Sequence, residues 1–387
     1  MNDSLLKKVY NDIENKYEDS LNLLEIIVNI DSPTVNKEGV NLVGHEIRRK
    51  LESENIDYEI LENENYGNHI IATIKGKKKG KILLMGHKDT ALPDGTAKNR
   101  PFKITENHIA GPGVSDMKSG LVTMIQAASS LKNLAADEIC DIQLLFTPDE
   151  ELGSPISKSV ITELAKDASC VFNLEPGRPD GSIVTARKGS AHLRIDIEGK
   201  AAHSGAFIEN GISANDELAQ KMIHIKKLMN IEDGITINFG KLNGGIGNNV
   251  VSPCAYTSIH LAFWKLEDYK KTYKEIEGIV NTSYIEGTKS KLSGDIGMLP
   301  MEKNEGVLKL LEIVKNAANY LDINITEQTT KGAADVGFTA ALGIPSICGM
   351  GPIGGNWHAE NEYMELNSLI PRTKLLASSI LLFCKQL

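Results

Sequence analysis

The amino-acid sequence predicts an α/β protein in which a smaller α+β domain is inserted into a larger one. Short apolar runs bounded by Gly and Pro alternate with helical segments along the first half, as expected for a mostly parallel sheet between helices. After Lys188 apolar and polar residues alternate strictly, which is typical of an antiparallel strand with one exposed face. The α/β pattern returns near Met301. We therefore expect the large domain over 1–188 and 300–387 and the inserted domain over 189–299.

Apolar residues at helical spacing predict the helices of the large domain. These segments are 20–30, 40–54, 119–134, 159–167, 305–321 and 368–385. Four apolar runs, 81–85, 142–146, 170–174 and 346–350, have the length and composition of buried parallel strands. The basic run from Lys75 to Lys81 lies between two strand-like segments, and we interpret it as a solvated hairpin turn.

The inserted domain has a regular order of predicted elements. An alternating strand begins at Ala191, and a helix at 215–229, a strand at 236–240, a strand at 255–263 and a charged helix at 266–282 follow. With a final strand, the order is strand, helix, two strands, helix and strand. This order indicates a ferredoxin-like sandwich.

Composition and charge narrow the function classes. A chain of 387 residues with 41% hydrophobic and 24% charged content has the makeup of an ordinary globular protein with room for two domains. The net charge of -9 and the pI near 5.6 argue against a nucleic-acid partner, because phosphate binding needs a concentrated basic surface. A charged, helix-like beginning and the lack of a long apolar run predict a cytoplasmic protein that does not cross a membrane.

The five cysteines do not form a recognisable framework. Their number is odd, no Cys-x-x-Cys spacing occurs, and most lie inside apolar runs, as buried free thiols do. We therefore expect neither a disulfide scaffold nor a cysteine metal site.

Acidic and histidine residues follow each of the four predicted parallel strands. They are His87 and Asp89, then Glu150 and Glu151, then Glu175, and finally His358 after a glycine-rich stretch. Ligands bind in the crevice outside the carboxyl ends of such strands, so these side chains are expected to converge. Together with Asp116 they predict a two-metal hydrolase centre.

His87 and Asp89 are two residues apart at a strand end, so in extended geometry their side chains point the same way. This allows His87 to bind a metal through one ring nitrogen while Asp89 accepts the N–H of the other. Asp116 lies in a glycine-containing stretch, Gly111-Pro-Gly-Val-Ser-Asp, just before a predicted helix. The glycines permit a backbone that turns the carboxylate into a crowded site.

Glu150 and Glu151 indicate a metal site more specifically than His87 and Asp89 do. Neighbouring carboxylates at the mouth of a sheet repel each other unless a cation is near or one of them is protonated. Adjacent side chains diverge, so Glu151 is expected to bind metal while Glu150 acts as general base. Carboxylate and imidazole donors without a thiolate suit two zinc ions, with manganese or cobalt as substitutes.

The motifs resemble those of a di-zinc metallopeptidase family. Gly-His-x-Asp, Gly-Pro-Gly-x-x-Asp-Met-Lys-x-Gly, Asp-Glu-Glu-x-Gly, Asn-Leu-Glu-Pro and Gly-Lys-Ala-Ala-His-Ser-Gly occur in order over nearly the whole chain. The family includes carboxypeptidase G (glutamate carboxypeptidase), acetylornithine deacetylase, succinyl-diaminopimelate desuccinylase and aminoacylases. The resemblance implies a zinc exopeptidase catalytic domain of the phosphorylase/hydrolase-like fold, with an inserted dimerisation (lid) domain.

The resemblance also implies roles for single residues. It implies that Asp116 bridges two metals, that His87 and Glu175 complete one site, and that Glu151 and His358 complete the other. A cis peptide after Asp116 is implied as well.

In the inserted domain the resemblance implies two further roles. His203 is expected to reach the active site of a partner subunit and stabilise the oxyanion. Asn249 matches a substrate-contacting asparagine. The role of His203 implies a homodimer formed through the inserted domain.

This chain departs from the family pattern at two positions. Carboxypeptidase-type members carry an arginine that clamps the free carboxylate of the substrate and a second arginine before a proline, and here Ala262 and Leu299 stand in their places. As substitutes we consider Arg178 and Lys188 first, with Arg187 and Lys331 as others.

Several functions remain open at this point. Carboxypeptidase or dipeptidase action on a small substrate competes with deacylation of an N-acyl amino acid and with hydrolysis of an amide that lacks a carboxylate. A cyclic amide or a carbamate is a further target. A non-catalytic binding protein is the alternative from another class, and the presence of every expected ligand and of Glu150 disfavours it.

Overall fold

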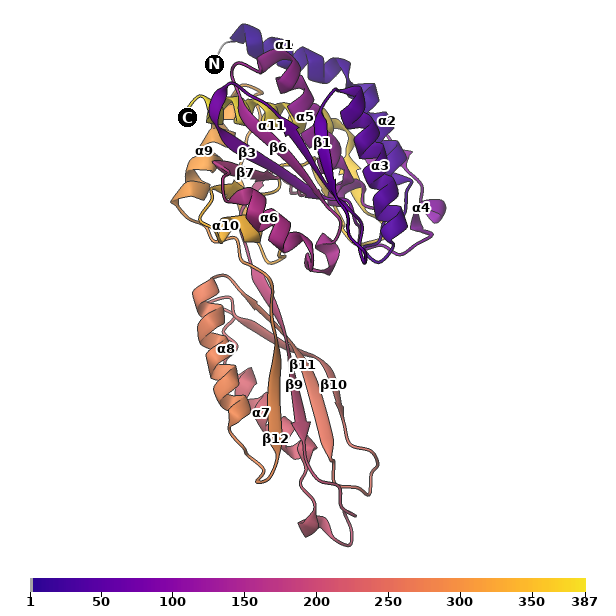
Figure 1. Ribbon diagram of the computed structural model, residues 1–387, viewed down its shortest axis with the longest axis vertical. Coiled ribbons are helices and arrows are strands. Elements are labelled where there is room, and N and C mark those ends of the chain that lie inside the picture. Colours follow the sequence, from indigo (N-terminus) through magenta and orange to yellow (C-terminus); the bar gives the residue numbers. More distant parts are fainter. Residues whose placement is uncertain (1–2) are drawn as a thin grey trace. The chain divides into compact units, whose positions relative to one another are not determined.

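The computed structural model describes residues 3–387, so the first two residues of the predicted large domain lie outside it. The chain divides into two compact units (Figure 1). The first unit comprises the chain up to Thr185, Lys303–Thr329 and Ala334–Leu387, and the second comprises Ala186–Glu302 and Thr330–Ala333. Among residues 3–387, no helix combines the length and apolar character of a membrane span.

A six-stranded mixed sheet forms the centre of the first unit, in the order β1-β2-β6-β3-β7-β14. Its strands are β1 (Asp57–Leu61), β2 (His69–Ile74), β3 (Lys78–His87), β6 (Cys140–Thr147), β7 (Cys170–Asn173) and β14 (Ser346–Ile347). β3 pairs in parallel with β6 and β7, and β7 pairs in parallel with β14, whereas β2 is antiparallel to β6 and to β1. The three parallel pairings place the ends of β3, β6 and β7 at one edge.

The central strands of this sheet are largely buried on both faces, and the rest of the first unit consists mainly of helices. They are α1 (Asp3–Asn15), α2 (Tyr17–Val28), α3 (Lys37–Ser53), α4 (Thr96–Asn99), α5 (Ser119–Ala135), α6 (Ser157–Ala165), α9 (Glu305–Asn319), α10 (Val336–Ala340) and α11 (Leu369–Cys384). α5 contacts β3 and β6, and α11 packs against α5 and α9. Leu84, Phe146 and Phe172 lie in the core that these helices share.

The predicted hairpin at Lys75–Lys81 is wrong. β2 and β3, which flank this basic run, are not neighbours, because β6 lies between them and pairs with both. The two flanking segments are strands, as their apolar pattern predicts, but only the packing of the sheet decides which strands are adjacent.

A second, four-stranded sheet in the first unit has the order β15-β16-β5-β4. Its strands are β4 (Lys103–Ile104), β5 (His108–Ala110), β15 (Gly354–Gly355) and β16 (Tyr363–Glu365). β5 leads into the loop that carries Asp116, and the β15–β16 connection carries His358. Because β16 pairs with β5, these two loops emerge from one small sheet.

The second unit has the strand and helix order of a ferredoxin-like sandwich. Its elements are β9 (Gly189–Glu198), α7 (Ala214–Lys226), β10 (Thr236–Gly244), β11 (Cys254–Phe263), α8 (Leu266–Asn281) and β12 (Lys289–Met298). The antiparallel sheet has the order β10-β11-β9-β12. The remaining pair of the chain, β8 (Ile183–Arg187) and β13 (Glu327–Thr330), forms a two-stranded ladder.

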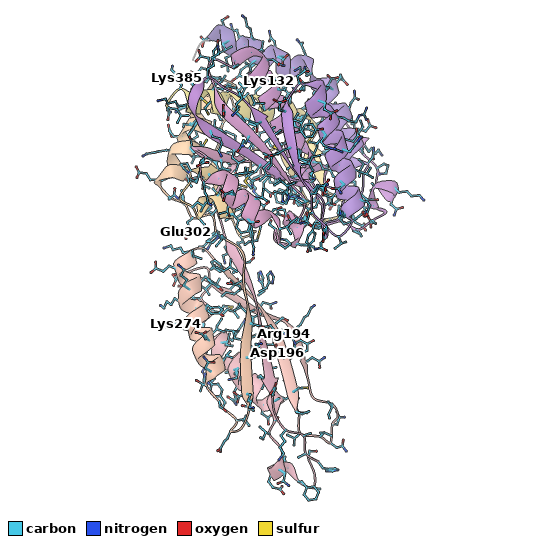
Figure 2. All side chains as sticks on the ribbon, in the orientation of Figure 1. Lys132, Arg194, Asp196, Lys274, Glu302 and Lys385 are labelled. Atoms are coloured by element: carbon cyan, nitrogen blue, oxygen red, sulfur yellow. The ribbon has the colours of Figure 1, made fainter. Side chains whose placement is uncertain are left out.

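β9 shows why this sheet is covered on one face only. Leu193 and Ile195 are buried in a core with residues of α7 and α8. Arg194 and Asp196 alternate with them and form an ion pair at 2.6 Å (Figure 2). The guanidinium of Arg194 also lies 3.8 Å from the ring centroid of Tyr256.

Candidate metal centre

The first unit brings the predicted strand-end residues together at one edge of its sheet. β3 ends at His87, β6 ends three residues before Glu150, and β7 ends two residues before Glu175. Because β6, β3 and β7 are consecutive in the sheet, their carboxyl ends are adjacent. Asp116 and His358 are contributed by the loops of the small sheet.

The two carboxylate oxygens of Asp116 face different histidines. Oδ1 lies 3.1 Å from Nε2 of His87, and Oδ2 lies 3.2 Å from Nε2 of His358. Glu175 Oε1 lies 3.9 Å from His87 Nε2, and Glu151 Oε2 lies 3.2 Å from His358 Nε2. The arrangement therefore has two halves that share one carboxylate.

These spacings fit metal ions. Ligand atoms about 2.0–2.2 Å from a tetrahedral zinc ion lie roughly 3–3.5 Å from one another. Ligand atoms of His87, Asp116 and Glu151 all lie within 4.8 Å of one another. Glu151 Oε1 is buried and has no hydrogen-bond partner among residues 3–387, as expected for an oxygen that binds a cation.

The electrostatics of the site also favour a bound cation. Burial raises the pKa of Glu150 well above its usual value, and the nearby carboxylates of Glu175, Asp335 and Glu151 raise it further. Burial also raises the pKa of Glu151. For Asp116, burial acts in the same direction, but hydrogen bonds from His358 and His87 outweigh it and hold the pKa well below its usual range. Crowded carboxylates of this kind are stabilised by a bound cation.

Asp89 supports both ends of the site. Nδ1 of His87 lies 2.9 Å from the main-chain carbonyl oxygen of Asp89 and 3.4 Å from the Asp89 carboxylate oxygen Oδ1, so the carbonyl is the nearer partner. The Asp89 carboxylate accepts the main-chain N–H groups of Glu150 (3.2 Å) and Glu151 (3.1 Å) and the Thr34 hydroxyl (2.6 Å). The sequence predicted a contact of this carboxylate with His87 alone and gave no sign of its hydrogen bonds to the main chain of Glu150 and Glu151.

Glu362 supports the Asp116 loop, and sequence reasoning missed it. Its buried carboxylate accepts N–H groups of Gly113 (2.9 Å), Ser115 (2.9 Å) and Asp116 (3.0 Å). The Asp116–Met117 peptide is cis, as the family resemblance implied. In the sequence Glu362 resembles the exposed Glu360, and only its position four residues after His358 was a usable signal.

Asp335 is the second buried carboxylate that sequence reasoning missed. It accepts the hydroxyl of Thr147 at 3.2 Å, at the end of β6, and it also accepts the hydroxyl of Ser154. Burial raises the pKa of Asp335 to about 7. Asp335 therefore braces the turn that carries Glu150 and Glu151 from the side of α10.

The structure separates the predicted substrate-binding residues. Arg178 is in the first unit, buried with its guanidinium 4.7 Å from the centroid of Trp357, the neighbour of His358. Lys188 is buried in the second unit, where its ammonium donates to the Gly234 carbonyl. Of the two, Arg178 lies in the unit that holds the candidate metal centre.

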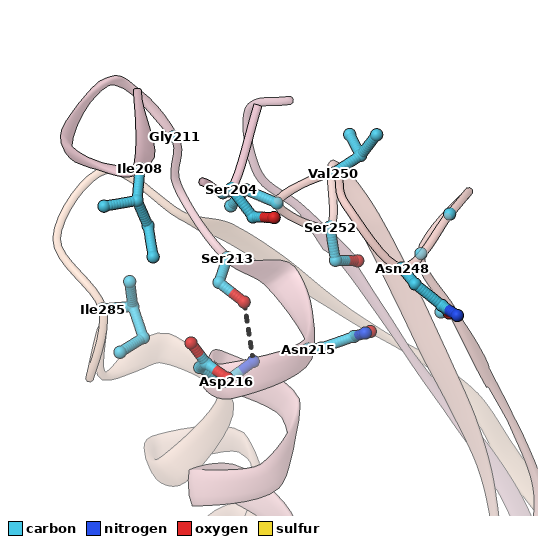
Figure 3. A pocket seen from close by; sticks show the side chains of 14 residues that line it. Ser204, Ile208, Gly211, Ser213, Asn215, Asp216, Asn248, Val250, Ser252 and Ile285 are labelled. Carbon is cyan, nitrogen blue, oxygen red and sulfur yellow. Dashed lines mark hydrogen bonds between the residues drawn. The ribbon is translucent and has the colours of Figure 1, made fainter. Parts of the chain in front are cut away.

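His203 and Asn249 lie together in the second unit. His203 is exposed and forms an isolated bridge with Val250, and the Asn249 carbonyl accepts the N–H of Ser204 at 2.9 Å. Next to them is a cavity of about 620 Å³, lined by Ser204, Val250 and the start of α7, where Ser213 caps the helix by accepting the Asp216 N–H (Figure 3). Ala262 is buried on β11.

Comparisons with known proteins indicate the family of this chain. The model of peptidase family M20/M25/M40 matches residues 83–382. Carboxypeptidase G2 of Pseudomonas sp. (strain RS-16) is 28% identical over 371 residues, which cover 93% of this chain and 88% of that protein.

Solved structures show the same fold. A tripeptidase of Staphylococcus aureus superposes with a TM-score of 0.80 at 23% identity and covers 96% of this chain and 99% of that one. The aminopeptidase PepT of Bacillus cereus superposes with a TM-score of 0.78 at 22% identity, over 95% and 98% of the two chains.

Proposed function

We infer the roles of the site residues from one premise, that this chain belongs to peptidase family M20/M25/M40. The chain is accordingly a metal-dependent hydrolase of peptide or amide bonds. We propose that it cleaves one amide or peptide bond of a small substrate. The observation that supports this most strongly is the Asp116 carboxylate, whose two oxygens each face a different histidine.

Five residues would hold two metal ions. We assign His87 and Glu175 to one ion, His358 and Glu151 to the other, and Asp116 to both. Zinc suits these donors, and cobalt or manganese would replace it. When bound, such ions polarise the scissile carbonyl and lower the pKa of water.

Glu150 would move the proton. Its side chain is half-buried, its N–H donates to Asp89, and its pKa is raised, so it is suited to take a proton from water and pass it to the leaving amine. Glu150→Gln should lower kcat by about 10²–10⁴-fold with both metals retained. Near-wild-type kcat in this variant, with metal content verified by elemental analysis, would refute the assignment.

The substrate class has two candidates. Likeness to carboxypeptidase G2 supports an exopeptidase that acts at a free carboxylate, with Arg178 as its anchor in the absence of the expected arginines. Ala262 and Leu299 instead favour an N-acyl amino acid deacylase or a hydrolase of carboxylate-free amides.

A panel of dipeptides, N-acyl amino acids and carboxylate-free amides, assayed with the zinc-loaded enzyme, separates these candidates. Weak dependence on the carboxylate is expected if Ala262 and Leu299 are decisive. Strict dependence that is lost in Arg178→Gln would establish the first candidate.

We further propose a homodimer in which His203 serves the active site of the other subunit, with Asn249 contacting substrate. Mixing Glu150→Gln and His203→Ala chains tests this. If His203 acts across subunits, the mixed dimer regains one working site, because Glu150 of one chain meets His203 of the other. If His203 acts within its own chain, the mixture stays inactive.

The cytoplasm is the proposed location. All five cysteines are free in the structure, and four of them are buried. Free thiols are the usual state in a reducing compartment.

A further inference from the structure

A cavity of about 270 Å³ lies in the first unit between α3 and the ends of β1, β2 and β3. Its polar lining comprises Asn41, Arg48, Glu62, Asn68 and Lys88. Lys88 stands between His87 and Asp89, and successive side chains of an extended chain point to opposite faces. The cavity is therefore separate from the metal centre, although it shares a strand end with it.

Lys88 is fully buried and incompletely satisfied. Its ammonium donates to the Asn68 carbonyl at 2.5 Å, and within residues 3–387 no carboxylate oxygen lies within 4.0 Å of it. The carboxylates of Asp89 and Asp149 attract it from a greater distance, but main-chain N–H groups already occupy both. An ammonium has three donors, so donors remain for another acceptor.

Lys221 shows how this chain satisfies a buried lysine elsewhere. Its ammonium is also fully buried, pairs with Glu217 at 2.7 Å, and donates to the carbonyls of Ile279 (3.2 Å), Val280 (2.8 Å) and Thr282 (2.5 Å). An unpaired buried charge is costly, and a pair with hydrogen bonds offsets that cost. Lys88 lacks such a carboxylate partner, and its buried side chain borders the cavity instead.

Arg48 adds a second positive charge to the cavity. Asn41, Gly44 and Arg48 are spaced three and four residues apart on α3 and therefore share one face. Asn41 accepts the Asn68 N–H through Oδ1 at 2.8 Å, which leaves its Nδ2 group as a further donor. Glu62 is the only acid in the lining and is exposed, so cations and donors dominate.

We propose that this cavity binds a small oxyanion between the Lys88 ammonium and the Arg48 guanidinium. A guanidinium presents a planar fork that matches two oxygens of a sulfate, phosphate or carboxylate group. Since one water occupies about 30 Å³ of liquid, the cavity has room for such an anion together with several waters. The anion would be the acceptor for the Lys88 ammonium, as Glu217 is for the Lys221 ammonium.

Selenate, a heavier analogue of sulfate, tests the place of binding. Crystals of the zinc-loaded full-length enzyme are soaked in sodium selenate and measured at the selenium edge. An anomalous peak in the cavity that marks a selenate with its oxygens within hydrogen-bond distance of both Lys88 Nζ and the Arg48 guanidinium supports the proposal. An empty cavity, or one in which Glu62 pairs with Lys88, overturns it.

Calorimetric titration of the same enzyme with sulfate and with acetate tests the chemistry and shows whether the site prefers a tetrahedral anion or a carboxylate. Arg48→Gln should weaken binding of the preferred anion at least about tenfold, since it removes charged hydrogen bonds. Arg49→Gln is the matched control, because Arg49 is exposed and pairs with Glu46. Unchanged binding in Arg48→Gln would place the anion elsewhere, including at the metals, and would overturn the proposal.

Glu62→Gln is expected to act in the opposite direction. It removes the only carboxylate of the lining, so binding should tighten by a few-fold. Weaker binding in this variant would contradict the proposed orientation of charges.

Discussion

The two halves of the candidate metal centre are built differently. His87 ends a central strand and its side chain is 2% exposed, whereas His358 lies in the β15–β16 connection and its side chain is 55% exposed. His358 also has a φ of 62°, in the left-handed region, and Asn356, two residues earlier, has a φ of 57°. The sheet therefore holds one half, and a loop supplies the other.

This difference suggests distinct tasks. A buried histidine with Nδ1 against a carbonyl is preorganised, and it would hold its ion whether or not substrate is present. In the other half His358 is exposed, whereas the side chain of Glu151 is as buried as that of Glu175 (7% and 8% exposed), so the two halves differ in their histidines. Asp116 links the halves, so changes to Asp116, to each histidine and to the supporting residues should have graded effects.

The largest effect is expected for Asp116→Asn, because it removes the carboxylate common to both halves. Both metals should be lost and activity should fall to background. Elemental analysis after dialysis and the rate of amide hydrolysis measure this. Retention of two ions per chain would show that Asp116 is not the bridge.

His87→Ala and His358→Ala should separate the two halves. Each variant should have lower activity and should lose one of the two metal ions. In the metal-free protein, His87→Ala should also lower the free energy of unfolding by about 1–3 kcal/mol, because it leaves buried acceptors without a partner. His358→Ala should lower it by less, at most about 1 kcal/mol, because its side chain is half exposed and solvent screens its ion pairs. Urea unfolding measures both, and equal losses would contradict the comparison.

Glu362→Gln should have an intermediate effect that acts through Asp116. It weakens three hydrogen bonds to the main chain of the Asp116 loop and leaves the side chains of the expected ligands unchanged, so metal affinity should fall about 10–100-fold. Competition with a zinc chelator measures this, and excess zinc should restore kcat. Glu360→Gln, the exposed neighbour, is the control and should match the wild type.

The smallest effect is a pH dependence of the exposed half. Hydrogen bonds to Asp116 and Glu151 raise the pKa of His358 in the metal-free protein to about 11. Because the folded-state pKa exceeds the unfolded one, this ion pair contributes stability fully below pH 6.5 and loses it as the pH rises toward 11. A metal must displace the proton, so zinc affinity at this half should rise with pH.

Calorimetry in buffers of different ionisation enthalpy measures the protons released on zinc binding. His358→Gln should remove one of them. Equal proton release in the variant and the wild type would show that His358 is neutral before the metal binds.

Strand-end residues were predictable because the signal is local. His87, Glu150, Glu151 and Glu175 each follow an apolar run that has to be buried, and parallel strands bring their ends to one edge. His358 also follows an apolar run, 346–350, but only Ser346–Ile347 of that run forms a strand, and a glycine-rich stretch separates the run from His358. Glu362 and Asp335 had neither signal, since a buried carboxylate is recognisable only by what surrounds it.

The sequence by itself determined the kinds of donor, their order along the chain and their place after apolar runs, because burial of those runs depends on local composition. Tertiary structure alone decided which strands are neighbours, which histidine each oxygen of Asp116 faces, and that Glu362 holds a loop 246 residues away. The same holds for Lys88, whose place beside Arg48 depends on how α3 packs. Such contacts depend on distances between segments far apart in the chain, which local pattern and propensity do not encode.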